Sequence, residues 1–401
     1  MGERPALATA ADRLRRRGLR WAMQIVSSPS TEDRLSVLSQ DSQFDLACAC
    51  GTRTNDDHRR RTGSGAWLYP VSLPNGGQSV LLKTLLSNAC TNNCAYCPLR
   101  AERDVRRCTL APEQLVRAFM GYYRSGQAMG LFLSSGVLGS ADRTMERLNA
   151  VAWILRRREQ FRGHIHLKII PGASDAAIEA AVSLANTVSV NIETPGERHF
   201  APMCSGKDYL QDVIRPMQRV YELTRPGSRY AGVQQTTQFI VGAADETDRE
   251  IVRYAAGLYE RLNLHRVYFS AYQRGAGRAD LPGETRPAAG GDLLTREHRL
   301  YQADFLLRKY GFSASEFVYA PGGNLPLDVD PKELWARHHP EFFPVDLQRA
   351  SRLQLLRVPG LGPVTVERIL RLRGAHGRLR RLEDVGRMTA RLAKARAYVK
   401  V

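Results

Sequence analysis

The stretch VLLKTLLSNACTNNCAYCPLR, residues 80–100, decides the fold of this chain. An apolar run at Val80–Leu86 is followed at once by Cys90, Cys94 and Cys97, in a C-x3-C-x2-C spacing. Three thiols in one short loop suit metal ligation or redox chemistry better than disulfides, because we expect a protein that is not exported. The loop therefore predicts a metal or iron–sulfur centre after a strand.

Outward from this loop, apolar runs alternate with helix-period stretches as far as about Phe312. The expected strands are Val80–Leu86, Gly130–Ser134, His164–Ile170, Thr187–Ile192, Thr237–Val241 and Arg266–Ser270. The expected helices are Pro112–Gly126, Asp142–Phe161, Ser174–Ala185, Lys207–Thr224, Glu246–Leu262 and Asp292–Tyr310. Six such units imply parallel strands and right-handed crossovers. An unusual polar loop after every strand favours an α/β fold of the partial (β/α)6 TIM-like barrel type over a doubly wound sheet.

The rest of the chain divides around this barrel. Four segments are expected: 1–78, an N-terminal extension and loops packing on the barrel; 79–315, the barrel; 316–344, an ordered linker; and 345–401, a small all-α module. Apolar residues at 43% and charged residues at 24% are typical of a folded globular protein. No apolar run approaches the roughly 20 residues that cross a bilayer. We therefore expect a soluble, cytoplasmic protein with no membrane partner.

The charge of the chain favours a polyanionic partner. Basic residues exceed acidic ones by 58 to 40, which gives a net charge of +18. Residues 349–401 hold twelve Arg and two Lys against three acidic residues, a net charge of +11. The preference for Arg over Lys is explained by the nucleotide composition of the source genome, but the clustering is not.

A helix-hairpin-helix pattern lies inside this basic segment. Residues Leu355–Leu372 read LLRVPGLGPVTVERILRL, in which Gly360 and Gly362 permit a tight turn. Backbone amides at the start of the second helix can then face a phosphate of DNA. A helix-packing device or a protein–protein module has the same pattern, and the local charge favours DNA. Residues Leu379–Val399 resemble a degenerate second copy, to which we assign no phosphate contacts.

The cysteines leave several interpretations open. A cubane cluster usually takes four thiolates, so three in one loop leave the fourth iron open. The alternative is a structural zinc site with Cys108 as the fourth ligand. Cys48 and Cys50 form a C-x-C that we interpret as buried structural thiols. Two further catalytic candidates are Cys204, as a radical relay or an ordinary thiol, and Lys168, as a site residue or a charge at a strand end.

The cysteine spacing, the aromatic Tyr96 before the last cysteine and the position after the first strand resemble the radical S-adenosylmethionine superfamily. The resemblance implies that Cys90, Cys94 and Cys97 ligate one 4Fe-4S cluster whose open iron is chelated by S-adenosyl-L-methionine. It also implies that one electron cleaves the sulfonium and yields a 5′-deoxyadenosyl radical. The protein then supplies positioning and excludes water.

The same resemblance implies further cofactor contacts. The positions carried over are Tyr96, Ser134, Ser135, Gly136, Asn191, Glu193 and Gly242. Tyr96 and the segment Ile240–Glu246 correspond to contacts with the adenine. Ser134–Gly136 replaces a Gly-Gly-Glu-like edge that meets the methionine amino group, and it does so through backbone groups because the glutamate is absent. Asn191 and Glu193 lie two apart on one side of the fourth strand and face the ribose.

A narrower resemblance covers about residues 32–400. VLLKTLLSNACTNNCAYC, GLFLSSGV, HLKIIPGAS, SVNIETP, IVGAADETDREI, REHRLYQADFLLRKYGF, DPKELWA, FFPVDLQRA and LLRVPGLG follow in this order. They resemble a radical S-adenosylmethionine family described as DNA modification or repair proteins and often associated with a uracil-DNA-glycosylase-like partner. The sequence departs from the pattern of that family at residues 48–62 and 273–291, which we expect to form loops at the opening of the substrate site.

We therefore expect an oxygen-sensitive iron–sulfur enzyme that acts on a nucleotide in DNA, reduced by a flavodoxin or ferredoxin. The hairpin would clamp the backbone, and a target base would have to leave the stack. Tyr268 and Tyr272 are candidates for stacking on that base, with core packing as the alternative. Two other functions stay open: radical modification of RNA, and a non-catalytic, cluster-containing DNA-binding partner of a glycosylase.

Overall fold

The computed structural model describes residues 29–44, 60–61, 67–72, 77–285, 292–376, 379 and 381–401. Cys48 and Cys50 lie outside the described residues. Residues Thr31–Val401 form one compact unit. None of the helices within the described ranges is both long and apolar enough to span a bilayer.

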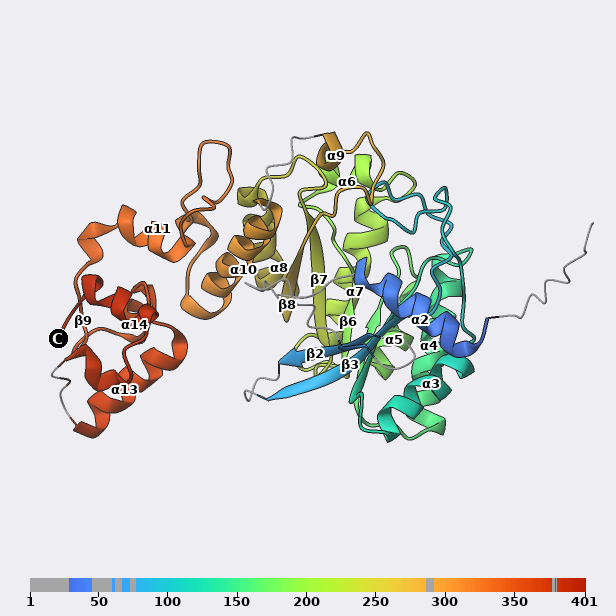
Figure 1. Ribbon diagram of the computed structural model, residues 1–401, viewed down its shortest axis with the longest axis horizontal. Coiled ribbons are helices and arrows are strands. Elements are labelled where there is room, and N and C mark those ends of the chain that lie inside the picture. Colours follow the sequence, from blue (N-terminus) through green and yellow to red (C-terminus); the bar gives the residue numbers. More distant parts are fainter. Residues whose placement is uncertain are drawn as a thin grey trace, which may run out of the picture. The chain divides into compact units, whose positions relative to one another are not determined.

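A curled sheet of eight described strands, paired in chain order, forms the barrel (Figure 1). The parallel strands are β3 (Gln78–Leu85), β4 (Gly130–Ser134), β5 (His164–Lys168), β6 (Thr187–Ser189), β7 (Gln234–Val241) and β8 (Arg266–Ala271). All six lie where the apolar runs predicted them. This sheet with helices between its strands is the predicted partial TIM barrel, so the expected fold class is confirmed.

Helices connect these strands. They are α3 (Pro112–Arg124), α4 (Ala141–Trp153), α5 (Asp175–Leu184), α6 (Glu197–Met203), α7 (Arg215–Thr224), α8 (Asp248–Leu262), α9 (Pro282–Thr285) and α10 (Asp292–Tyr310). Side-chain caps fix several starts: Ser140 Oγ accepts from the Arg143 amide, and Thr247 Oγ1 accepts from the Glu250 amide. Helices α4 and α8 therefore begin where a Ser or Thr satisfies a free amide.

Two predicted helices are interrupted by π-helical turns. The expected helix over 142–161 ends at Trp153 and continues as η2 (Ile154–Arg158). The expected helix over 207–224 begins with η3 (Tyr209–Ile214), before α7. Each of these π-helical segments has only five or six residues, which is too short to show an apolar period of its own, so the sequence pattern does not reveal it.

The expectation that residues 1–78 form an N-terminal extension and loops is wrong in part. Strand β2 (Trp67–Ser72) pairs antiparallel with β3 and extends the sheet, and β1 (Arg60–Arg61) pairs antiparallel with β2. Helix α2 (Thr31–Asp41), followed by the short helix η1 (Ser42–Phe44), buries Leu35 and Leu38 against the core. Pro70 inside β2 hid the strand, because proline removes a ladder donor and usually argues against a strand.

The residues after the barrel form short elements. They are η4 (Ala314–Glu316), α11 (Pro331–His338), η5 (Pro340–Phe342), β9 (Val345–Asp346), α12 (Arg352–Arg357), α13 (Pro363–His376), η6 (Leu382–Val385), α14 (Ala390–Ala395), η7 (Arg396–Tyr398) and β10 (Val399–Lys400). Strand β10 pairs parallel with β9. Leu355, Leu356, Ile369 and Leu392 belong to a core cluster of their own. This cluster holds α12, α13 and α14 together.

The turn between α12 and α13 contacts α14, and the turn between η6 and α14 contacts α13. Gly360, between α12 and α13, has φ +88°, and a Cβ there would meet the backbone oxygen of Arg391 in α14. Gly386, between η6 and α14, has φ +142°, and a Cβ there would lie 2.5 Å from Arg368 Nη1 of α13. Arg368 Nη1 also donates to the Val385 carbonyl at 3.1 Å. Residues Leu379–Val399 are thus a second turn-and-helix unit packed reciprocally on the first.

The two glycines predicted to shape the first turn differ in role. Gly360 is required because it combines a left-handed backbone with close packing against α14. At Gly362, a Cβ would meet only the Tyr310 hydroxyl, at an ordinary 3.5 Å. The expectation that both glycines avoid interference from a Cβ therefore applies to Gly360, whereas the space at Gly362 would admit a Cβ.

Candidate iron–sulfur and cofactor site

The cysteine loop follows β3 and is fastened to the segment after β4. The Leu86 amide donates to the Ser134 carbonyl at 2.8 Å, and the Gly136 amide donates to the Ser87 carbonyl at 2.7 Å. Further along, the Thr91 amide donates to the Val137 carbonyl at 2.9 Å. These bonds between neighbouring strand ends fix the backbone that carries the first cysteine.

Gly136 allows this close approach. A Cβ at this position would collide with the Ala89 carbonyl oxygen and lie 3.2 Å from the Cys90 Cβ. Ser135 Oγ donates to the Gly136 carbonyl at 2.7 Å, and Ser134 is buried. The Ser134 carbonyl and the Gly136 amide bond to the cysteine loop. The cofactor contacts expected of Ser134, Ser135 and Gly136 stay predictions, and they concern the other polar groups of these residues.

Each of the three thiols accepts hydrogen bonds from nitrogen. Cys90 Sγ accepts from the amides of Asn92 and Val137, both at 3.4 Å. Cys97 Sγ accepts from the Leu99 amide at 3.4 Å. Cys94 Sγ accepts from Lys207 Nζ at 3.2 Å. Hydrogen-bond donors stabilise thiolate ligands and tune iron–sulfur clusters, so this donor set fits a cluster.

The surroundings of Cys94 and Cys97 shift the pKa values of their thiols in opposite directions. Hydrogen bonding to the Cys204 thiol and the charge of Lys207 lower the pKa of Cys94 to about 6. Burial raises the pKa of Cys97 to about 12. Metal ions bind the thiolate form, so Cys94 is prepared for ligation, whereas Cys97 would release its proton to solvent when the metal binds.

The zinc interpretation fits the geometry less well. Cys108 Sγ donates to the Arg34 carbonyl of α2 at 3.7 Å, and the Cys108 amide donates to Asn88 Oδ1. Among the described residues, no group of three or more His, Cys, Asp or Glu side chains converges on a site for a single ion. A tetrahedral zinc ion needs its sulfur ligands roughly 4 Å apart. A cubane needs only the three thiolates of the loop, one on each of three irons, and leaves Cys108 with its bond to the Arg34 carbonyl.

Tyr96 and Glu193 lie together, and their contacts with the cofactor stay predictions. The Tyr96 hydroxyl donates to Glu193 Oε1 at 2.9 Å. Burial raises the pKa of Tyr96, which keeps this hydroxyl protonated. Glu193 is buried, has φ +63° and forms an isolated parallel bridge with Phe239 of β7, whereas strand β6 ends at Ser189 and not at Ile192 as predicted. Asn191, two residues before Glu193, is also buried.

Gly242 lies in a tightly held turn after β7. It has φ +88°, and its amide donates to Glu246 Oε1 at 2.6 Å. Arg296 of α10 pairs with Glu246 at 3.2 Å and with Asp248 at 2.6 Å, and all three side chains are nearly buried. The segment predicted to lie along the adenine is therefore anchored to α10.

The catalytic candidates have different surroundings. Lys168 ends β5 on the face of His166, opposite the fully buried Leu167. Cys204 is buried at the end of α6 beside Cys94, where the hydrogen bond with Cys94 and burial raise its pKa. The Tyr272 hydroxyl donates to Glu284 Oε1 at 2.5 Å, which fastens the loop after β8. Tyr272 thus has a packing role in this loop, and its stacking on a base stays a prediction.

Part of the loop expected at the substrate mouth covers the cysteine loop. Arg100 and Arg103 each donate through Nη1 to the Ala276 carbonyl, at 2.9 and 2.7 Å. The Arg278 amide donates to the Ala95 carbonyl at 2.8 Å. Residues 275–278 therefore close one side of the site.

The sequence did not point to Lys207 or His199. Lys207 lies three residues after Cys204, and α6 is too short to show a periodicity. His199 of α6 is buried, with Nδ1 2.7 Å from Asp245 Oδ1 and Nε2 3.2 Å from Glu250 Oε1. It fastens α6 to the loop after β7 and to the start of α8.

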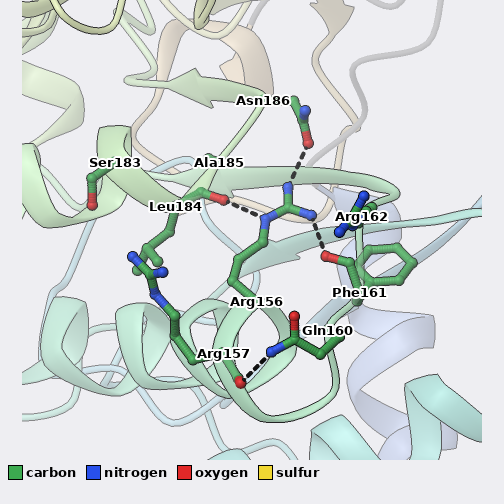
Figure 2. A pocket seen from close by; sticks show the side chains of 9 residues that line it. All are labelled: Arg156, Arg157, Gln160, Phe161, Arg162, Ser183, Leu184, Ala185 and Asn186. Carbon is green, nitrogen blue, oxygen red and sulfur yellow. Dashed lines mark hydrogen bonds between the residues drawn. The ribbon is translucent and has the colours of Figure 1, made fainter.

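A pocket of about 460 Å³ lies at the amino ends of β5 and β6, away from the cysteines (Figure 2). Its central Arg156 donates to the carbonyls of Leu184, Phe161 and Gly163 and to Asn186 Oδ1, at 2.7–2.9 Å. These bonds join the end of η2 to the start of β6. We therefore assign Arg156 a structural role.

The chain is similar to a known family over the region that contains the cysteine site. The family model described as the Radical SAM superfamily matches residues 84–256. No curated protein matches the sequence. The FeFe-hydrogenase maturase HydG from Carboxydothermus hydrogenoformans has a similar structure, with 18% identity, a TM-score of 0.45, and coverage of 56% of this chain and 51% of that chain. Methylornithine synthase (PylB) is similar at 13% identity, with a TM-score of 0.45 and coverage of 57% and 61%.

The matched region contains the cysteine loop, Tyr96, Glu193 and Gly242. The superfamily uses a 4Fe-4S cluster and S-adenosyl-L-methionine, and when bound this pair supplies radical chemistry at an open iron. Cys90, Cys94 and Cys97 would hold the cluster, and the nitrogen donors that bond to their sulfurs fit this role. Residues 84–256 are therefore similar to the radical SAM superfamily, whose cofactors are a 4Fe-4S cluster and S-adenosyl-L-methionine.

Proposed function

We propose that this radical SAM enzyme modifies or repairs a nucleotide in DNA and that its C-terminal module, residues 345–401, holds the DNA backbone. The observation that carries the proposal is the state of the arginines in this module. Arg349, Arg371, Arg387 and Arg391 are exposed, and none pairs with a carboxylate in the described part of the chain. Unpaired surface arginines are the groups that neutralise phosphates.

Other arginines of the module are engaged in its own structure. Arg373 donates to the carbonyls of Gln348 and Ala350, at 2.9 and 2.8 Å. Arg357 pairs with Glu316, and Arg368 holds the second turn. The excess of arginine thus separates into a structural set and a surface set. The surface set is the one that we assign to DNA.

The turn between α12 and α13 supports backbone contacts. Val364, in the first turn of α13, is 80% exposed, so the amino end of this helix lies at the surface. Pro363 opens the helix without an amide, and the following amides have no helical partner. Helix N-termini bind phosphate through such amides, without reading base sequence.

A salt titration tests the DNA contact. We expect Arg387→Gln with Arg391→Gln to weaken duplex binding and to lower the slope of log K against log salt by about 2, one for each lost phosphate contact. Fluorescence anisotropy of a labelled duplex measures both quantities. Arg117→Gln with Arg261→Gln, an equal charge change on α3 and α8, is the control. If both double variants behave alike, the module is not the DNA-binding surface.

A product assay tests the reaction. Reconstituted protein is incubated anaerobically with reductant, S-adenosyl-L-methionine and matched DNA or RNA, and the nucleosides are analysed by mass spectrometry. We expect an altered nucleoside from DNA, with deuterium from the substrate found in 5′-deoxyadenosine if hydrogen is abstracted. A product from RNA alone would contradict the DNA assignment. An intact cluster without any 5′-deoxyadenosine would favour the non-catalytic role.

The resemblance to the DNA modification and repair family supports two protein partners. We propose a flavodoxin or ferredoxin as the electron donor and a uracil-DNA-glycosylase-like protein as a partner. The donor is tested by cluster reduction with each purified reductant, and the glycosylase by co-purification with the tagged chain. No reduction, or no co-purification, would remove the respective partner.

A further inference from the structure

Lys207 lies in a short link whose backbone is fixed at both ends. Its amide donates to the Cys204 carbonyl at 3.2 Å, and the next residue, Asp208, caps η3 by accepting from the Gln211 amide at 2.7 Å. The end of α6 is itself fastened to the cysteine loop, because the Ala95 amide donates to the Met203 carbonyl at 2.7 Å. The position of Lys207 relative to Cys94 is therefore set by the backbone.

The side chain brings a positive charge to one cluster ligand. Lys207 Nζ lies 3.2 Å from Cys94 Sγ, and Cys94 is only 7% exposed. Away from water, a charge interacts with its neighbours much more strongly than at the surface. In the described structure, the Cys94 sulfur is the one thiol of the triad bonded to a cationic side chain, whereas Cys90 and Cys97 accept from backbone amides.

This asymmetry has a consequence for electron transfer. Reduction adds one negative charge to a cluster, and a fixed cation beside a ligand stabilises the reduced form more than the oxidised form. Hydrogen bonds to cluster sulfurs and local charge are the means by which proteins set cluster potentials. We propose that Lys207 raises the reduction potential of the 4Fe-4S cluster through its contact with Cys94. Lys207 is then a positioning residue, and the inference does not depend on which substrate the enzyme takes.

The test compares three variants of the full chain, reconstituted anaerobically. Lys207→Gln removes the charge and keeps a hydrogen-bond donor, Lys207→Arg keeps both, and Arg198→Gln removes an exposed charge from the same region of α6. Iron and sulfide are counted per chain. The midpoint potential is then measured by a redox titration followed by electron paramagnetic resonance, without S-adenosyl-L-methionine.

We expect a more negative midpoint in Lys207→Gln than in the parent, with Lys207→Arg and Arg198→Gln close to the parent. An unchanged midpoint in a fully loaded Lys207→Gln protein would overturn the proposal. Unchanged potential together with weaker S-adenosyl-L-methionine binding would assign Lys207 to the cofactor instead. A Lys207→Gln chain that takes up no iron would assign it to cluster assembly and would also overturn the proposal.

Discussion

At the scale of single residues, Cys94 and Cys108 separate the two interpretations of the cysteines. We expect Cys94→Ala to abolish the iron–sulfur absorbance, because it removes a ligand from the loop. Cys108→Ser is the matched control, since the Cys108 thiol bonds to the Arg34 carbonyl and not to the triad. Visible absorbance and iron content measure both. Loss of metal in the Cys108 variant would instead support a four-cysteine zinc site.

Residue types in the cysteine loop could be predicted because the chemistry is local. The spacing of Cys90, Cys94 and Cys97 indicates metal ligands even when the fold is not known. Lys207 could not be predicted, because its role depends on a contact across 113 residues of sequence. Gly136 was predicted as a cofactor contact, but the space it leaves for the Ala89 carbonyl follows only from how two loops pack.

At the scale of elements, the strands and most helices follow from apolar periodicity and caps. The prediction failed where the local pattern was weak or misleading: in β2, with its internal proline, in the short helix α6, and at the π-helical turns. In each of these, tertiary packing determines the structure. The left-handed backbone of Glu193, in the segment after β6, likewise has no local sequence signal.

The turn between α12 and α13 gives a prediction that distinguishes its two glycines. We expect Gly360→Ala to lower the free energy of unfolding by on the order of 2 kcal/mol, because φ is positive and the Cβ meets the Arg391 carbonyl. Gly362→Ala meets only an ordinary contact, so we expect a change within about 0.5 kcal/mol. Urea unfolding followed by circular dichroism measures both. Equal losses in the two variants would contradict the turn geometry.

Lys332 of α11 makes the free energy of unfolding depend on pH. It is buried, donates to the Leu361 carbonyl at 2.6 Å, and burial lowers its pKa to about 7. An unfolded lysine titrates near pH 10.4, so between about pH 7 and 10 the unfolded chain binds more protons than the folded one. The contribution of Lys332 to the free energy of unfolding therefore rises with pH in this window.

We expect Lys332→Met to flatten the rise in the urea midpoint between pH 7 and pH 9, as followed by tryptophan fluorescence. Lys309→Met, which removes an exposed lysine of α10, is the control and should keep the slope of the parent. A parent and a Lys332→Met variant with identical slopes would show that this lysine is not the titrating group.

At the scale of the whole molecule, the site is assembled from segments that are distant in sequence. The cysteine loop meets the end of β4, the Glu193 turn, the end of α6 and residues 275–278. Alternating strands predicted that these segments share one edge of a barrel. They did not predict which side chains would touch, because those contacts depend on loop conformations that have no periodic signal.

The central claim is that three thiolates hold a 4Fe-4S cluster with one open iron. The most direct measurement is electron paramagnetic resonance of the reduced, anaerobically purified protein, before and after addition of S-adenosyl-L-methionine. We expect four irons and four sulfides per chain, a cubane signal, and a change in its g-values on addition, because the added molecule binds iron directly. Tetrahedral zinc–sulfur coordination with no iron would contradict the claim.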